Sequence, residues 1–425
     1  MLARSVIAGL AWLVAAQGVA AQGTLEAAYV LLGPQGTLAR AVVSGGSACP
    51  AVAVNGASQP MAVRSSGNSA FPVLVCELPL QAGTTSAVLA GRNLPLPPAT
   101  LASVAVLGDT GCRLKSDGKA LKQVRRQVDH ADGKFQDCDV VSQWPFSALA
   151  ASVAAKKPQL VVHVGDYNYR ESPCPPGDAG CQGSPYGDNW PTWKADFFAP
   201  GAPLLAAAPW IAARGNHESC SRAGAGYMLF LDPTPARDGK PPACIDLLPV
   251  FTVAVGGQSF VVMDSSNADD VCPCNSAPYA KQFAALRPTP GSWLVTHRPV
   301  WGFNPKGPIN PTLQGALQQW QGKLPPGITL AVAGHIHLWE AIGFADGRSP
   351  QFVIGNGGTA LDKQVGPLTG KKIGGTTVSY ADTKDEWGFA LFSPGSAAGN
   401  WTARYYSVEG NEKFSCAVTP TAVSC

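Results

Sequence analysis

The sequence predicts an α/β or α+β sandwich covered by helices on both faces, preceded by a small β-rich unit. After residue 100, short and continuous apolar runs are typical of strands buried on both faces. Helical patterns and long loops separate these runs. Before residue 97, short apolar segments alternate with turn residues and have no helical period. A chain of 425 residues, 46% hydrophobic and 14% charged, can bury cores of this size.

The N-terminal part, residues 22–98, is predicted to be a small β-sandwich. It is rich in Val, Ala, Gly and Ser, with apolar runs at Ala51–Val54 and Phe71–Val75. The Pro-rich stretch Leu94–Pro98 predicts a semi-rigid linker, because proline runs favour extended geometry. The second domain is expected to span residues 99–425.

The second domain contains the strands and helix that define its class. A helix is predicted from about Pro145 to Lys156, with Phe146, Leu149 and Val153 on one face. Residues 387–392 and 401–408 predict an antiparallel pair that closes one sheet. Strands are expected at Leu101–Leu107, Leu160–Val164, Trp210–Ala213, Phe260–Met263, Trp293–Val295 and Ile328–Ala333.

The first 21 residues have the pattern of a signal peptide. Arg4 precedes an apolar run at Val6–Ala16, and small residues lead to Val19-Ala20-Ala21. The run is too short to span a bilayer. The mature protein is therefore expected to be exported, periplasmic or secreted, without stable membrane association.

Cysteine usage agrees with export. The twelve cysteines are an even number and predict up to six disulfides, although spacing leaves their connectivity open. Cys272 and Cys274 remain after the near neighbours are paired. These neighbours are Cys49 with Cys76, Cys112 with Cys138, Cys174 with Cys181, Cys220 with Cys244, and Cys416 with Cys425.

The charge pattern argues against a nucleic-acid partner. The net charge of +3 comes from 31 basic and 28 acidic residues, with no long basic run. A small-molecule substrate is the partner that the composition leaves open.

Five predicted strands each end in a potential metal ligand. Glycine adjoins several of these ligands, as expected where the backbone turns sharply beside an ion. Open sheets bind ligands at the carboxyl ends of their strands, so the five loops could converge. Four of the six histidines fall in them. The segments are Gly108-Asp109-Thr110-Gly111, Gly165-Asp166-Tyr167-Asn168-Tyr169, Gly215-Asn216-His217-Glu218, His297-Arg298-Pro299 and Gly334-His335-Ile336-His337.

In this order, the motifs resemble those of purple acid phosphatases, which are calcineurin-like metallophosphoesterases. The resemblance covers roughly residues 100–410 and extends to Trp193 and Pro209-Trp210. It implies two mixed sheets flanked by helices. The N-terminal β-rich part is similar to that family's layout more loosely.

The resemblance also implies a dinuclear metal centre. One ion would be held by Asp109, Asp166, Tyr169 and His337, and the second by Asp166, Asn216, His297 and His335, so that Asp166 bridges them. Three anionic ligands suit a trivalent ion and the other set suits a divalent one. The expected cofactors are Fe(III) and a divalent ion, namely Fe, Zn or Mn.

The expected activity is hydrolysis of phosphate monoesters by a metal-bridging hydroxide. Asp166 would bridge the ions, while His217 would protonate the leaving oxygen or, alternatively, only orient a ligand. Arg170, Arg214 and Arg298 either reach phosphate oxygens or are surface charges. His163 is expected to be a core or supporting imidazole.

Two other functions remain open from the sequence. A sphingomyelinase-like or nucleotide-type phosphodiesterase on the same fold would normally carry Asp-x-His in the first motif, where this chain has Gly111. A non-catalytic exported binding protein would be favoured by losses among the ligands, and none is seen.

Overall fold

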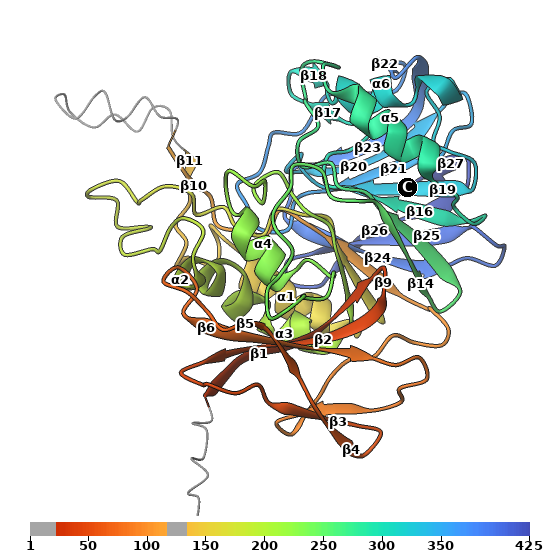
Figure 1. The fold of residues 1–425 in the computed structure, drawn as a ribbon. Coiled ribbons are helices and arrows are strands. Elements are labelled where there is room, and N and C mark those ends of the chain that lie inside the picture. Colours follow the sequence, from red (N-terminus) through yellow and green to blue (C-terminus); the bar gives the residue numbers. More distant parts are fainter. Residues whose placement is uncertain (1–22, 117–133) are drawn as a thin grey trace, which may run out of the picture.

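The computed structural model describes residues 23–116 and 134–425, and within them two large sheets pack face to face (Figure 1). The predicted signal peptide lies outside the described residues. The larger sheet runs β27 (Ala422–Ser424), β26 (Glu412–Thr419), β25 (Trp401–Ser407), β24 (Gly388–Pro394), β9 (Val104–Leu107), β12 (Leu160–His163), β13 (Trp210–Ala212), β1 (Thr24–Gly33), β2 (Gly36–Ser44), β6 (Val73–Leu80) and β5 (Ala62–Ser65).

The smaller sheet pairs its central strands in parallel, as the centre of the larger sheet also does. The order of the smaller sheet is β14 (Phe251–Val255), β15 (Gln258–Val262), β16 (Ser292–Val295), β19 (Ile328–Ala333), β21 (Gln351–Ile354), β20 (Trp339–Phe344), β23 (Thr376–Lys384) and β22 (Lys372–Ile373).

The first strand predicted after residue 100 begins at Val104 rather than Leu101. The amide of Leu101 instead donates to the carbonyl of Gly256.

The main core lies between these sheets. Val104 and Val162 of the larger sheet and Phe260 and Trp293 of the smaller one belong to one buried cluster. Alternate residues of the larger sheet, such as Ala105 and Val161, face a second cluster on its outer side. Both faces of the central strands are thus covered, which is why their sequences are continuously apolar.

Helices cover the two outer faces and give the predicted layered class. The helix expected from Pro145 is confirmed as α1 (Phe146–Ala155), which packs with α3 (Ala199–Ala207) against the larger sheet (Figure 1). The smaller sheet is covered by α5 (Ser276–Ala285) and α6 (Pro311–Ala316). The other helices are α2 (Trp190–Trp193), η2 (Lys194–Phe198), α4 (Gly224–Phe230) and η3 (Gln318–Trp320).

The strand-rich N-terminal region is also as expected. Val52 and Val54 lie in one buried cluster with Ala39 and Ala41 of β2, so a small sheet packs on the first strands as the second layer of a sandwich. Strand β1 pairs in parallel with β13, which makes this layer continuous with the larger sheet. The domain boundary near residue 98 stays a prediction. The small sheet runs β4 (Ala57–Pro60), β3 (Ala51–Val54), β7 (Ala87–Leu89) and β8 (Arg92–Asn93).

Six disulfides form among the described residues, and they leave no free cysteine there. The five near-neighbour pairs are as predicted, and Cys272 pairs with Cys274. Among the helices of residues 23–116 and 134–425, none has the length and apolar character needed to cross a membrane. Two two-stranded sheets, β10 (Leu114–Lys115) with β11 (Lys134–Phe135) and β17 (Phe303–Asn304) with β18 (Gly307–Pro308), complete the described strands.

Candidate metal centre

The two sheets bring the five predicted ligand loops to one place. In each sheet the parallel strands end at the same edge, and hydrogen bonds join the loops across the gap between sheets. The backbone amide of His335 donates to Oδ2 of Asp109 at 2.9 Å across this gap, and within the larger sheet that of His217 donates to Oδ1 of Asp166 at 2.8 Å. All eight predicted site residues lie in this region, namely Asp109, Asp166, Tyr169, Asn216, His217, His297, His335 and His337.

The first group of side chains converges on the hydroxyl of Tyr169. Its oxygen lies 2.8 Å from Oδ1 of Asp109, 2.8 Å from Oδ2 of Asp166 and 2.9 Å from Nε2 of His337. All four side chains are buried. Burial, together with the charge of Asp166, raises the pKa of Asp109 well above its usual range. Two carboxylates this close in a site shielded from water can therefore both be ionised only if positive charge lies nearby.

The second group converges on the side-chain oxygen of Asn216. Oδ1 of Asn216 lies 2.9 Å from Nε2 of His297 and 2.7 Å from Nδ1 of His335. Nε2 of His297 also lies 3.2 Å from Oδ2 of Asp166. That same carboxylate oxygen contacts Tyr169 in the first group, so Asp166 lies between the two groups.

The hydrogen bonds of the imidazoles direct their lone pairs inward. Nδ1 of His297 lies 2.9 Å from the carbonyl oxygen of Val164, and Nδ1 of His337 lies 3.0 Å from that of Ala360. A carbonyl can only accept, so each Nδ1 carries the proton and each Nε2 presents a lone pair. Nε2 of His297 then faces the acceptor oxygen of Asn216. Two acceptors that face one another at this distance, with no proton between them, are consistent with a cation that both would bind.

The electrostatics of the imidazoles agree with metal binding. Burial lowers the pKa of His335 to about 4 and that of His337 to about 3, which keeps both rings neutral at pH 7. Ligand atoms of Asp166, His297 and His335 all lie within 4.8 Å of one another. The donor set fits two cations of different hardness. The role of each residue as a ligand stays a prediction.

Backbone strain marks three of these residues. Asp109, Asp166 and His335 have φ values of 57°, 60° and 74°, in the left-handed region that residues with a side chain seldom occupy. Gly165 adopts a φ of 101°, and a Cβ there would lie 2.6 Å from Nδ1 of His297. Glycine before Asp166 is therefore required both by the turn and by the close approach of the second sheet.

Two buried carboxylates hold the loops in place. Glu218 accepts from the amides of Tyr167 at 2.8 Å and Asn168 at 3.0 Å, which fixes the loop that carries Asp166 and Tyr169. Asp196, from η2, accepts from the amides of Cys112 and Tyr169 and from Nε of Arg170. Asp196 thus ties the first ligand loop to the second.

His217 lies beside the cluster with a partner that the sequence analysis missed. Its Nδ1 lies 2.9 Å from Oε1 of Glu171, and its Nε2 lies 3.8 Å from Oδ2 of Asp166. Burial lowers the pKa of His217 to about 4, although Asp166 and Glu171 act in the opposite direction. The only sequence signal for Glu171 is its position two residues after Tyr169 on a ligand loop.

Asp270 is the second residue that the sequence analysis missed. Its Oδ2 lies 2.8 Å from Nε2 of His335 and pairs with Arg298. Asp270 follows β15 by several residues, so no strand-end pattern points to it. Of the three arginines singled out, Arg170 and Arg214 pair with the buried carboxylates Asp196 and Asp264, and neither lines the pocket over the site.

His163 is buried, as expected of a core imidazole. Its ring stacks on Tyr167 with the centroids 4.0 Å apart, and its Nε2 lies 3.1 Å from Oγ1 of Thr110.

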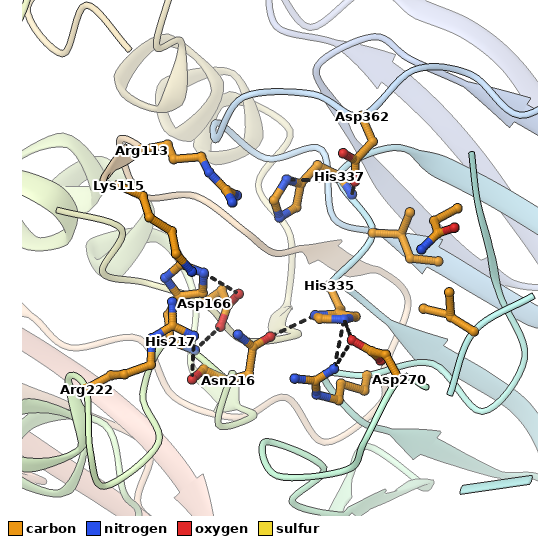
Figure 2. Close-up of a pocket in the computed structure, with 14 residues that line it drawn as sticks. Arg113, Lys115, Asp166, Asn216, His217, Arg222, Asp270, His335, His337 and Asp362 are labelled. Atoms are coloured by element: carbon orange, nitrogen blue, oxygen red, sulfur yellow. Dashed lines mark hydrogen bonds and ion pairs between the residues drawn. The ribbon is translucent and has the colours of Figure 1, made fainter. Parts of the chain in front are cut away.

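A pocket of about 410 Å³ opens over the two groups (Figure 2). Asp166, Asn216, His217, His335 and His337 form part of its lining. Its other charged residues are Arg113, Lys115, Arg222, Asp270, Arg298 and Asp362. A small anion that enters the pocket would therefore meet both the candidate ligands and several cationic side chains.

Comparisons with known proteins identify the family and the fold. The model of the calcineurin-like phosphoesterase family matches residues 102–338, a range that contains all eight site residues. A search of curated proteins gives no match. Among solved structures, the fold is similar to a purple acid phosphatase from yellow lupin (Lupinus luteus) seeds, with a TM-score of 0.56, 14% identity, and 92% of this chain and 74% of that chain covered. The structure of PhoD gives a TM-score of 0.51 at 12% identity over 95% and 91% of the two chains.

Proposed function

Because the chain belongs to the calcineurin-like phosphoesterase family, we propose that it is an exported dinuclear-metal phosphatase that hydrolyses phosphate monoesters. The observation that carries the proposal is the convergence on the Tyr169 oxygen of Asp109, Asp166 and His337, each within 2.9 Å. Asn216, His297 and His335 would hold the second ion. Asp166 would serve both ions, since its Oδ2 contacts members of both groups.

When bound, the two cations would lower the pKa of a water molecule and neutralise charge on the phosphoryl group. A phenolate such as Tyr169 favours Fe(III), and the amide and imidazole set favours a divalent ion such as Fe, Zn or Mn. Burial of the ligands excludes competing water from the cluster.

His217 would supply the proton to the leaving oxygen at acidic pH, because burial lowers the pKa of its ring to about 4. Contact with Glu171 fixes its Nδ1, so that Nε2 is directed toward Asp166 and the pocket. The cationic lining of the pocket supports monoesters over diesters, because a monoester carries more negative charge near neutral pH. Six disulfides support export.

The test is a substrate panel that holds the leaving group constant. The metal-loaded protein is assayed with p-nitrophenyl phosphate and with bis(p-nitrophenyl) phosphate. We expect a higher kcat/KM for the monoester. A higher value for the diester would move the assignment to a phosphodiesterase, and metal binding without hydrolysis of either ester would indicate a binding protein.

A further inference from the structure

Four buried side chains of the N-terminal layer enclose the C-terminal end of α4. They come from four neighbouring strands of the larger sheet, and each residue is at most 3% exposed. In the pairing of these strands, Arg40 lies directly opposite both Tyr29 and Glu77, so the three side chains share one face of the sheet. We call the four residues the α4 socket: Tyr29 on β1, Arg40 on β2, Arg64 on β5 and Glu77 on β6.

The α4 socket binds the carbonyl groups that a helix leaves without partners at its C-terminal end. Arg64 donates from Nη2 to the carbonyl oxygen of Met228 at 2.5 Å and from Nε to that of Leu229 at 2.9 Å. The carbonyl oxygen of the last helical residue accepts from Nη1 of Arg40 at 2.8 Å and from the hydroxyl of Tyr29 at 2.7 Å. Two guanidinium groups at this end also interact favourably with the helix dipole.

The charges of the α4 socket are balanced inside it. Oε2 of Glu77 lies 3.1 Å from Nη2 of Arg40 and 2.8 Å from Nη1 of Arg64. Oδ1 of Asp232, just beyond the helix, lies 3.8 Å from Nη2 of Arg64. Buried ion pairs fix geometry when their hydrogen bonds are complete, because any displacement leaves a charge without its partner. The end of α4 is therefore held rigidly by the N-terminal layer.

Helix α4 follows the loop that carries two of the candidate site residues. The amide of Ala223, the residue before the helix, donates to the carbonyl oxygen of His217 at 2.9 Å. Nη1 of Arg222 donates to the carbonyl oxygen of Asn216 at 3.0 Å. These bonds couple the backbone of both site residues to the start of the helix. A shift of α4 would therefore move Asn216 and His217 relative to Asp166.

We propose that the α4 socket positions the second metal site, so that the N-terminal layer supports the metal centre and is not a separate module. Arg40, Arg64 and Tyr29 are positioning residues that act through α4 on Asn216 and His217. The inference rests on the proposed function, which gives these two residues their roles. The site at Tyr169 should change less, because its amide is held by Asp196.

Zinc affinity of the iron-loaded, full-length protein tests the α4 socket, with a chelator as competitor. Arg64→Gln should lower this affinity about threefold or more, because coupling through a packed network is of this size. The variant should also lower kcat more than it changes KM, since His217 moves with the helix. The visible band of the iron-loaded protein should persist. A merely structural role would lower the free energy of unfolding and leave the zinc affinity of the folded protein unchanged.

Tyr29→Phe is a milder second variant, because it removes only one hydroxyl contact with the end of α4. It should lower zinc affinity in the same direction, and it decides the question if Arg64→Gln does not fold. Arg348→Gln is the matched control. Arg348 is a buried arginine that donates to the carbonyls of Gly322 at 2.8 Å and Gly374 at 3.1 Å, on segments without a candidate ligand. It should lower stability and leave zinc affinity unchanged.

Two outcomes would overturn the proposal. The first is a zinc affinity equal to that of wild type in Tyr29→Phe and in any folded Arg64→Gln protein. The second is an equal loss of affinity in Arg348→Gln, which would show a general effect of stability. A wild type that binds zinc but hydrolyses no ester would refute the proposed function, and the zinc affinities of the variants would still decide the role of the α4 socket.

Discussion

Nε2 of His335 lies 2.8 Å from Oδ2 of Asp270, and Nδ1 of the same ring faces Asn216. Nη1 of Arg298 also lies 3.0 Å from this Nε2 and can only donate, so the shorter contact with Asp270 is the one that would hold the proton on the outer nitrogen and leave the inner lone pair free. Contacts of this kind orient metal-binding imidazoles and raise their basicity. Asp270 is therefore a positioning residue for the candidate divalent site.

Asp270→Asn should lower the affinity for the divalent ion about tenfold or more, because the neutral amide stabilises this tautomer less well. Competition with a chelator for zinc measures the affinity. Asp269→Asn is the control, since Asp269 is exposed and adjacent. Equal affinities in the two variants would show that Asp270 does not act through His335.

Tyr169→Phe should remove visible colour from the iron-loaded protein without changing the fold. A phenolate bound to ferric iron gives a charge-transfer band in the visible, whereas the same oxygen on Zn or Mn gives none. Tyr169 is buried beside two carboxylates, and the variant loses one anionic ligand, so the trivalent ion should also be reduced more easily. Visible absorption measures the colour, and circular dichroism measures whether the fold is unchanged. A colourless wild type with stoichiometric iron would exclude Tyr169 as a ligand.

Asp166→Asn and His217→Asn should have different phenotypes. Loss of the shared carboxylate should weaken the binding of both ions, and asparagine tolerates the positive φ of 60° at this position. His217→Asn should retain the ions and lose turnover, because its imidazole lies beside the cluster. Metal analysis and steady-state kinetics separate the effects. If both variants lose metal to the same extent, the assignment of His217 to proton transfer is wrong.

Glu340→Gln should change how stability depends on pH. Burial raises the pKa of Glu340 well above its ordinary value of 4.5, so the folded protein keeps a proton that the unfolded chain releases above that pH. The free energy of unfolding of wild type should therefore fall, relative to the variant, by up to about 1.4 kcal/mol per pH unit as pH rises above 4.5. Below this pH the stabilities of wild type and the variant should depend on pH in the same way.

Urea unfolding across pH measures the effect of Glu340. Glu386→Gln is the control, because Glu386 is exposed and loses the same charge. Parallel stability curves for Glu340→Gln and wild type would contradict the explanation.

Most of the candidate site could be predicted from the sequence because its signal is local. Asp109 and Asp166 each come shortly after a buried strand, and the residue before each is a glycine. The apolar run, the turn residue and the ligand therefore stand next to one another in the sequence and can be recognised as one pattern. The helix from Pro145 was predictable for the same reason, since one face of a single segment is buried.

The remaining features depend on contacts between distant segments. Asp270 reaches His335 across 65 residues, and Arg113 is brought to the pocket only by the folded chain. The parallel pairing of β1 with β13 joins Leu31 to Trp210, and no pattern in either strand specifies its neighbour. Such features follow from tertiary packing, which sequence periodicity does not encode.

The central claim is tested most directly by titrating metal-free protein with ferric iron and zinc while following hydrolysis of p-nitrophenyl phosphate. The two groups that meet at Asp166 predict no activity without metal and a plateau at about two equivalents per chain. A plateau at about one equivalent, or full activity in the metal-free protein, would contradict the account.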